Sequence, residues 1–308
     1  MKKDFLTLFD YTSDEIKEIL SIAEDVKSNR FSDSIRKDMA GKSAVLIFDK
    51  PSLRTKLTFE TGIYELGGNA MSMSGANGRL GERESIADIA HNLERWVHLL
   101  VVRTFAHEAI VELAKECKVP VINALTDKYH PCQSLALGLT IKEKFGDKQI
   151  TLTYIGDGNN VCVSHMIFSA KMGYNFVAAT PEGYEISSKE LEIAREEAAK
   201  NGATITTTYS AQEAVKDADL VYTDVWASMG QEDEADERKR IFMPYQINSD
   251  LMSYAPKNAL FTHCLPAHRG DEVTDEVIDS DISIVFDEAE NRLHAHKAIM
   301  AYLLKEGN

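Results

Sequence analysis

Two hydroxyl side chains and one guanidinium follow directly on an apolar run near residue 50. The run 43–48 is typical of a buried strand, and the apolar residues after it recur at roughly helical spacing. The first N–H groups of a helix have no intrahelical partner, and the helix dipole adds positive potential there. Ser52 and Thr55 add hydroxyls to this helix start, and Arg54 adds a planar fork that fits phosphate oxygens. The stretch predicts a site for a phosphate-like anion, although an ordinary helix capped by Ser52 would use the same residues.

Further polar and reactive side chains stand where other predicted strands end. Ligands of open α/β sheets bind beyond the carboxyl ends of the strands, so we expect these residues to line ligand sites. Apart from any motif, this shared position is the strongest indication in the sequence that the chain is an enzyme. The residues are Arg103, His130, Gln133, the stretch Asp157-Gly158-Asn159-Asn160, Asp224, and the stretch His263-Cys264-Leu265-Pro266.

The elements that must hold these residues alternate along the chain. Apolar runs of strand length are followed by segments of helical length in both halves. This alternation predicts an α/β protein of two domains, each a parallel sheet covered by helices on both faces. We expect a first domain over residues 1–147, joined by a C-terminal helical segment over 289–308, and a second domain over 148–288. A strand over 282–286 is expected to precede the last helix.

Charge and cysteine content exclude several classes of partner. The formal net charge of −15 argues against nucleic acid and against an anionic membrane surface, although a local basic cluster can still bind a small anion. The four cysteines are scattered without a C-x-x-C pair, which fits a reducing compartment and argues against a disulfide framework or a zinc site. Neither a signal peptide nor a membrane span is apparent, so we expect a cytoplasmic protein.

The two glycines Gly156 and Gly158 invite a second interpretation, a dinucleotide-binding oxidoreductase. Val161 replaces the third glycine of the G-x-G-x-x-G pattern, and only Glu182, beyond a proline, follows the next predicted strand. A tight strand-to-helix turn accounts for part of the pattern without any nucleotide.

The histidines near the C-terminus invite other interpretations. His263 and Cys264 could form a nucleophilic pair, but neighbours in a strand face opposite sides, and an inert, buried Cys264 is the alternative. His294 and His296 lie about 200° apart on a helix, so we expect no shared metal ion.

Taken together, the short motifs occur in the order found in one enzyme family. They are Ser52-Leu-Arg-Thr55, Arg103, His130-Pro-Cys-Gln133, Asp157-Gly-Asn-Asn160, Asp224-x-Trp-x-Ser-Met-Gly230, His263-Cys-Leu-Pro266 and Glu290-Asn-Arg292. On these residues the chain resembles the ornithine carbamoyltransferases over essentially its whole length. The Ser-Met-Gly and His-Cys-Leu-Pro motifs separate that family from its aspartate-using relatives, which share mainly the phosphate half.

The resemblance implies transfer of the carbamoyl group of carbamoyl phosphate to the δ-amine of L-ornithine, which gives L-citrulline and phosphate in arginine biosynthesis. The first domain would bind carbamoyl phosphate and the second L-ornithine. Thr55, Arg103 and His130 would surround the carbonyl oxygen, where negative charge grows in the transition state. The residues implied to bind carbamoyl phosphate are Ser52, Leu53, Arg54, Thr55, Arg79, Arg103, His130, Gln133 and Arg292.

The resemblance also implies an ornithine site, with Asp224 and Cys264 orienting the reacting amine. The residues implied to bind ornithine are Asn160, Asp224, Ser228, Met229, Cys264 and Leu265, and those implied to act in catalysis are Arg103, His130, Asp224 and Cys264. The reaction would need no metal ion and no organic cofactor. The loop 228–240 would act as a lid, and the family assembles as homotrimers.

The sequence departs from the family at two positions of the phosphate site. Leu53 replaces the usual threonine, which removes a hydroxyl from the turn, and Arg79 stands where glutamine is common. In relatives the loop around Arg79 reaches a neighbouring subunit's site, so we expect Arg79 to restore phosphate attraction there. A transferase with another acceptor (putrescine, acetylornithine or aspartate) and a paralogue that only binds are the remaining alternatives.

Overall fold

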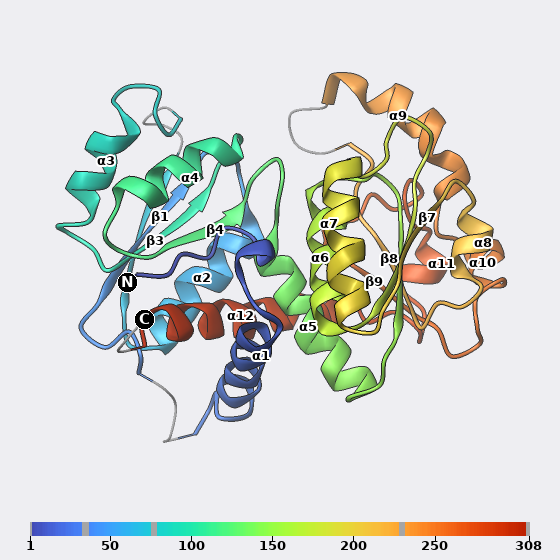
Figure 1. The fold of residues 1–308 in the computed structure, drawn as a ribbon, viewed down its shortest axis with the longest axis horizontal. Coiled ribbons are helices and arrows are strands. Elements are labelled where there is room, and N and C mark those ends of the chain that lie inside the picture. Colours follow the sequence, from blue (N-terminus) through green and yellow to red (C-terminus); the bar gives the residue numbers. More distant parts are fainter. Residues whose placement is uncertain (1, 33–36, 75–78, 228–231, 306–308) are drawn as a thin grey trace. The chain divides into compact units, whose positions relative to one another are not determined.

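The chain divides into two compact units. The computed structural model describes residues 2–32, 37–74, 79–227 and 232–305 (Figure 1). Unit 1 comprises Met1–Leu139 and Glu290–Asn308, and unit 2 comprises Thr140–Ala289. In the described part of the chain, no helix is both long and apolar enough to cross a membrane.

Unit 1 is built on a parallel sheet, which has four strands among the described residues. The strand order is β2-β1-β3-β4, and each neighbouring pair is parallel. The three strands after β2 in this order are almost entirely buried, as expected for a parallel sheet covered on both faces. The strands are β1 (Ser43–Phe48), β2 (Asn69–Ser74), β3 (Leu99–Arg103) and β4 (Val121–Leu125).

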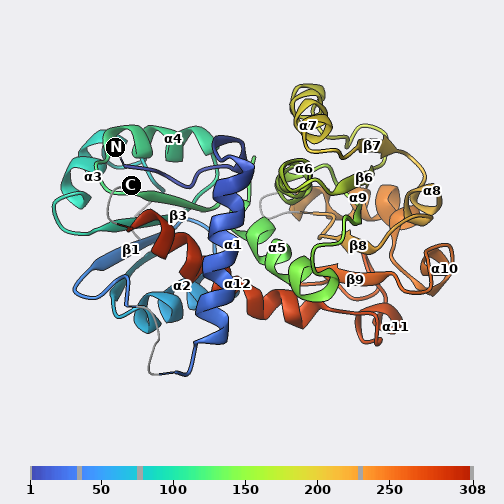
Figure 2. The same ribbon diagram turned by 60° about the horizontal axis from the view of Figure 1, so that its bottom comes forward.

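Helices cover both faces of the unit 1 sheet (Figures 1 and 2). Alternate strand residues, such as Val45 and Val102, pack with apolar residues of α3 and α4, while α2 and α12 lie on the other face. Gly62 of α2 lets α12 approach closely, because an added Cβ would lie 3.1 Å from Lys297 Cγ and 3.2 Å from Met300 Cε. The helices are η1 (Leu8–Asp10), α1 (Ser13–Ser28), α2 (Leu53–Glu65), α3 (Ile86–Leu93) and α4 (His107–Glu116), with α5 (Pro131–Phe145) and α12 (Val285–Leu303) contributing residues to both units.

Unit 2 contains a second parallel sheet, of five strands in order β7-β6-β5-β8-β9 among the described residues. The strands are β5 (Thr151–Ile155), β6 (Asn175–Ala179), β7 (Ile205–Thr208), β8 (Leu220–Thr223) and β9 (Leu260–His263). The helices are α6 (Asn160–Met172), α7 (Ser188–Lys200), α8 (Ala211–Val215), η3 (Glu232–Glu234), α9 (Ala235–Phe242), η4 (Met243–Tyr245), α10 (Ser249–Met252) and α11 (Asp275–Ile278).

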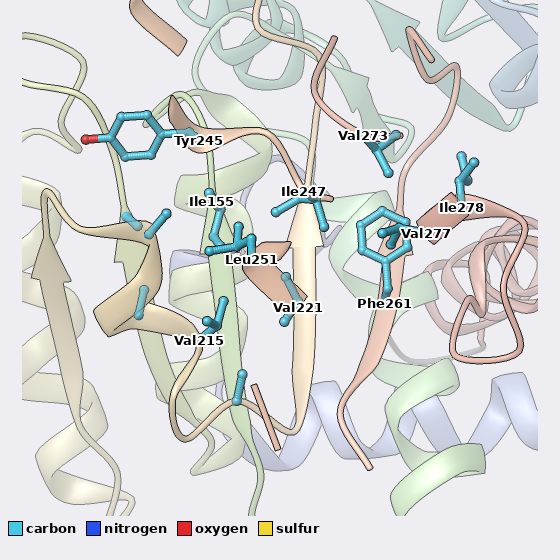
Figure 3. Close-up of a cluster of buried hydrophobic side chains, with 14 of the residues drawn as sticks. Ile155, Val215, Val221, Tyr245, Ile247, Leu251, Phe261, Val273, Val277 and Ile278 are labelled. Atoms are coloured by element: carbon cyan, nitrogen blue, oxygen red, sulfur yellow. The ribbon is translucent and has the colours of Figure 1, made fainter. Parts of the chain in front are cut away.

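A buried apolar cluster joins the unit 2 sheet to its short helices (Figure 3). Ile155 of β5, Val221 of β8 and Phe261 of β9 pack with Val215 of α8 and Leu251 of α10. The opposite face of the sheet is covered by α6, whose residues from Val161 to Lys171 are all buried. The predicted α/β architecture with helix-covered parallel sheets is therefore confirmed.

One predicted element is wrong. In place of a strand over 282–286, only Ser283 pairs with Phe261, and Val285 already begins α12, earlier than the predicted residue 289. The apolar run suits either element, and a buried carboxylate in the first helical turn decides between them. Glu288 is fully buried and accepts hydrogen bonds from Tyr222 Oη at 3.0 Å and Thr262 Oγ1 at 2.6 Å.

Candidate functional site

Most of the predicted site residues that the structure describes lie at the switch point of a sheet. In a doubly wound sheet, ligands bind beyond the carboxyl ends of the two strands between which the strand order reverses. This reversal falls between β1 and β3 in unit 1 and between β5 and β8 in unit 2. We call the unit 1 group the anion end and the unit 2 group the Asp224 corner. The anion end consists of Ser52, Leu53, Arg54, Thr55, Arg103, His130, Gln133 and Arg292, and the Asp224 corner consists of Asn159, Asp224 and Cys264.

The start of α2 forms the first part of the anion end. Ser52 occupies the N-cap position in an extended conformation, but its hydroxyl makes no capping hydrogen bond, so the alternative of a helix capped by Ser52 is not supported. Thr55 is buried in the first turn, and its hydroxyl accepts a hydrogen bond from the Arg292 guanidinium of α12. The Leu53 side chain is 69% exposed and therefore adds no core packing at this turn.

Buried polar residues complete the anion end. Arg103, the last residue of β3, lies in register with Phe48 at the end of β1, which brings it to the edge where α2 starts. Arg103 also lies in register with Leu125 at the end of β4, after which the chain leads to His130 and α5. Arg103, His130 and Gln133 are all at most 8% exposed. Burial of cationic groups at a switch point favours an anionic ligand, because a bound negative charge offsets their desolvation.

Arg79 lies over an aromatic ring of its own unit. Its guanidinium carbon is 4.3 Å from the centroid of Phe105, and the Lys50 ammonium is 4.2 Å from the same centroid. Phe105 follows Arg103 by two residues, so both cations contact the segment that leaves β3.

The Asp224 corner is a hydrogen-bonded group from three segments. Asp224, just after β8, is 6% exposed. Its Oδ2 accepts from Asn159 Nδ2 at 3.0 Å, and its Oδ1 accepts from the Val225 backbone N–H and the Cys264 thiol, both at 2.8 Å. The carboxylate is thereby fixed in orientation while its donors are neutral, which suits it to a cationic or amine ligand.

Asn159 belongs to the Asp224 corner, whereas the sequence interpretation assigned ornithine binding to its neighbour Asn160. Its Oδ1 accepts from the backbone N–H groups of Val161 and Cys162 and so caps α6, while its Nδ2 holds Asp224. Asn160 is the half-buried first residue of α6. The N-cap position is readable from the sequence, but the contact with Asp224 spans 65 residues.

Both ring nitrogens of His263 have partners closer than Cys264. The Cys264 Sγ lies 3.9 Å from His263 Nδ1, and this nitrogen accepts the Leu265 backbone N–H at 2.8 Å. The other ring nitrogen faces the buried Glu272 carboxylate at 3.2 Å. The thiol has its shorter contact with the Asp224 carboxylate, at 2.8 Å.

The Gly156–Asn160 turn of unit 2 is explained by packing. A Cβ on Gly158 would lie 2.6 Å from the backbone nitrogen of Ile186, so only glycine fits there. Asp157 pairs with Arg238 of α9 at 2.8 Å, and the same guanidinium nitrogen donates to the Trp226 carbonyl at 2.9 Å. Burial raises the pKa of Asp157, and the ion pair with Arg238 opposes that shift. The predicted residues Ser228 and Met229 lie outside the described residues.

The structure offers no arranged metal ligands among the residues it describes, where no group of three or more His, Cys, Asp or Glu side chains is placed to hold an ion. His294 and His296 are both fully buried on α12.

Two family models match nearly the whole chain. The aspartate/ornithine carbamoyltransferase carbamoyl-P binding domain matches residues 3–143, and the Asp/Orn binding domain of the same family matches residues 148–303. An ornithine carbamoyltransferase of Thermococcus kodakarensis is 49% identical over 303 residues, which cover 98% of this chain and 96% of the relative.

Solved structures show the same similarity in three dimensions. The ornithine carbamoyltransferase from Pyrococcus furiosus has a TM-score of 0.96 at 47% identity, with coverage of 100% of this chain and 98% of that chain. The anabolic ornithine carbamoyltransferase from Campylobacter jejuni has a TM-score of 0.92 at 38% identity, with coverage of 98% of each chain.

Proposed function

The chain belongs to the aspartate/ornithine carbamoyltransferase family, and we propose that it catalyses the ornithine carbamoyltransferase reaction in the anabolic direction. The carbamoyl group of carbamoyl phosphate passes to the δ-amine of L-ornithine, and L-citrulline and phosphate are released for arginine biosynthesis. The observation that carries this proposal is the 49% identity over almost the full length to a relative named for ornithine.

The anion end is the proposed site of carbamoyl phosphate. The phosphate sits on the N–H groups at the start of α2, with Arg54, Arg103 and Arg292 neutralising its charge. Thr55, Arg103 and His130 stabilise the carbonyl oxygen as it becomes negative. The side-chain oxygen of Gln133 accepts a hydrogen bond from the carbamoyl nitrogen. The supporting observations are the burial of Arg103, His130 and Gln133 and the hydrogen bond that Arg292 donates to Thr55.

The Asp224 corner is the proposed site of the reacting amine. Asn160, Leu265 and the segment Ser228-Met229 surround the α-amino-acid end of ornithine, while Asp224 and Cys264 orient the δ-nitrogen. The free δ-ammonium has a lysine-like pKa of about 10.4 and must lose a proton before it attacks. The fixed orientation of the Asp224 carboxylate supports this assignment.

The reaction needs no covalent intermediate on the protein. The neutral δ-nitrogen attacks the carbamoyl carbon and forms a C–N bond, and the resulting tetrahedral intermediate expels phosphate as the C–O bond breaks. A phosphate oxygen takes one of the two protons on the attacking nitrogen, and the other stays in the N–H group of citrulline. Positioning of the two substrates and stabilisation of the oxyanion supply most of the acceleration.

A homotrimer is the proposed assembly, formed through the unit 1 face that carries α2 and β2. Leu53, Leu57 and Tyr64 lie on one side of α2 and are 51–79% exposed, and Met71 and Met73 are exposed on the edge strand β2. Apolar side chains beside an edge strand suit a protein contact. A cytoplasmic location is proposed because all four cysteines are free thiols.

An acceptor panel tests the proposed function. Purified protein is incubated with carbamoyl phosphate and, in separate reactions, with ornithine, putrescine, acetylornithine or aspartate, and the carbamoylated product is identified by mass. Citrulline from ornithine, at a rate far above the other acceptors, is the expected result. Preference for another acceptor, or no product with any of them, would reject the proposal.

A further inference from the structure

His296 is a fully buried imidazole that faces the start of α2, and the proposed reaction gives it no role. Its ring stacks on Phe59 of α2, with centroids 3.8 Å apart and planes 10° from parallel. Its Nδ1 lies 3.0 Å from the hydroxyl oxygen of Thr58, one helical turn after Arg54. The stack and the hydrogen bond together fix the ring in one orientation.

The direction of this hydrogen bond follows from the single proton of the Thr58 hydroxyl. That proton is directed to the Arg54 carbonyl oxygen at 2.6 Å, with the Thr55 carbonyl oxygen at 3.2 Å as a second acceptor. The hydroxyl oxygen must therefore accept from His296, which assigns the proton to Nδ1. Burial, together with the nearby Arg292, lowers the pKa of His296 well below its usual value, so the ring is neutral and carries this one proton. Its Nε2 makes no hydrogen bond to any described residue.

The hydrogen bonds end on the peptide group that joins Arg54 to Thr55. The carbonyl oxygen of this peptide receives the Thr58 hydroxyl, and its N–H belongs to the first turn of α2, where intrahelical acceptors are absent. A hydrogen bond to the oxygen of a peptide polarises the group and strengthens its N–H as a donor, by about 10–30% per bond in a chain of hydrogen bonds. Arg292, four residues before His296, holds the hydroxyl of Thr55 in the same turn.

We propose that His296 is a positioning residue for the anion, acting through Thr58 to fix and polarise the Arg54–Thr55 peptide whose N–H faces the bound phosphate group. Its role rests on the proposed function, in which that turn binds the phosphate of carbamoyl phosphate. His296 itself touches neither substrate. Helix α12 thus supports the anion-binding turn at two points, through Arg292 and through His296.

Four single variants separate this role from simple packing. Thr58→Val and His296→Leu keep the approximate volume and remove one donor each. Thr58→Ser keeps the hydroxyl, and His296→Asn keeps an N–H donor at the position of Nδ1. Circular dichroism and thermal unfolding establish that each variant is folded, and the two conservative variants keep the test valid if a disruptive one does not fold.

Binding of inorganic phosphate, measured by calorimetry, is the first readout because it does not require turnover. We expect Thr58→Val and His296→Leu each to raise the dissociation constant about 3- to 10-fold, the size expected for one lost hydrogen bond. Thr58→Ser and His296→Asn should return it to within about twofold of the parent value. The double variant Thr58→Val with His296→Leu should bind phosphate no more weakly than Thr58→Val alone, because both changes interrupt one chain of hydrogen bonds.

Steady-state kinetics give the second readout, a rise in KM for carbamoyl phosphate with an unchanged KM for ornithine. Additive losses in the double variant, no recovery in His296→Asn, or lowered thermal stability with unchanged phosphate binding would each overturn the proposal. If the parent protein binds phosphate with this pattern but forms no citrulline, the proposed function fails while the role of His296 stands.

Discussion

The anion end and the Asp224 corner both lie at the switch point of a parallel sheet, but their polar groups are held differently. The anion end brings cationic side chains from β3, from the start of α2 and from α12 to one edge. The Asp224 corner brings three neutral donors to one carboxylate. The anion end has an excess of positive charge, whereas the Asp224 corner fixes the orientation of a single negative charge.

This difference indicates how each site responds to the loss of one group. Buried like charges repel each other, so a bound phosphate relieves a cost that the folded protein already bears. A carboxylate that neutral donors already orient is preorganised before its ligand binds. Removal of a cation from the anion end should therefore lower transition-state stabilisation strongly, whereas removal of a donor at the Asp224 corner should loosen orientation and cost less.

Arg103→Ala tests the larger effect. The loss of a cation beside the developing oxyanion should lower kcat/KM for carbamoyl phosphate at least about 100-fold, and Arg54→Ala should do the same. Initial rates at varied carbamoyl phosphate measure it. Arg83→Ala, at an exposed arginine of the loop before α3, is the matched control and should change the rate less than about twofold. If Arg103→Ala turns over like the parent protein, the anion end does not stabilise the transition state, and the expected difference between the two sites is wrong.

Cys264→Ala tests the second site. Loss of the thiol donor to Asp224 should lower kcat/KM for ornithine about 10-fold, while KM for carbamoyl phosphate stays within about twofold. Cys162→Ala, at a buried thiol of α6, provides the control and should leave both constants unchanged. If Cys264→Ala has the kinetics of the parent protein, the thiol contributes only packing, and the Asp224 corner is held by two donors rather than three.

Acid should destabilise unit 1 more than unit 2, because the two units differ in their buried imidazoles. Burial lowers the pKa of His294 to about 4 and that of His296 well below its usual value in unit 1, and burial lowers the pKa of His165 to about 3 in unit 2. Because the unfolded chain binds these protons below pH 6.5 and the folded chain does not, stability falls as the pH drops from about 6.5 toward the folded pKa values.

At pH 5.5 a histidine whose folded pKa is about 4 or lower costs about 1.4 kcal/mol of stability. Unit 1 contains His294, His296 and His107, whose pKa burial also lowers, and should therefore lose more stability than unit 2 with His165. Hydrogen exchange at pH 7.5 and 5.5, corrected for intrinsic exchange rates, measures this by comparing α12 with α6. Equal loss of protection in the two helices would show that these imidazoles do not distinguish the units.

Arg79→Gln tests the smallest expected effect. Replacing the guanidinium over Phe105 with a neutral amide should raise KM for carbamoyl phosphate about 2- to 3-fold, because an exposed cation–π contact and a distant charge contribute little. Arg83→Gln is the control for the loss of one positive charge in the same loop. A larger effect, seen only in the assembled oligomer, would mean that Arg79 reaches the site of a neighbouring copy.

The sequence predicted the sheets well because their signals are local. Apolar runs such as 43–48 and 99–102 are long enough to identify a buried strand without knowledge of their partners. The prediction for 282–286 failed because the helix that begins at Val285 depends on the burial of Glu288 among residues far away in sequence. Local pattern alone contains no information about that environment.

The prediction of the site residues also succeeded where the signal is local and failed where it is not. Residues at strand ends, such as Arg103 and Asp224, were recognisable from their position and type. The supporting contacts of Asn159 and His296 were not, because each residue has its partner 65 or 238 residues away. Their types suggest only a helix cap and a core histidine, and the roles become visible when the fold brings the partners together.

The division of unit 1 between the two ends of the chain has a consequence for its synthesis. Unit 2 is one continuous stretch and has all of its residues once Ala289 has left the ribosome, whereas unit 1 still lacks Glu290–Asn308. The Arg292–Thr55 hydrogen bond joins the last helix to the beginning of the chain, so it can form only when translation is nearly complete. The segment Met1–Leu139 is made first but cannot complete unit 1 until the last helix is released, so the usual N-terminal-first order of folding does not apply to this unit.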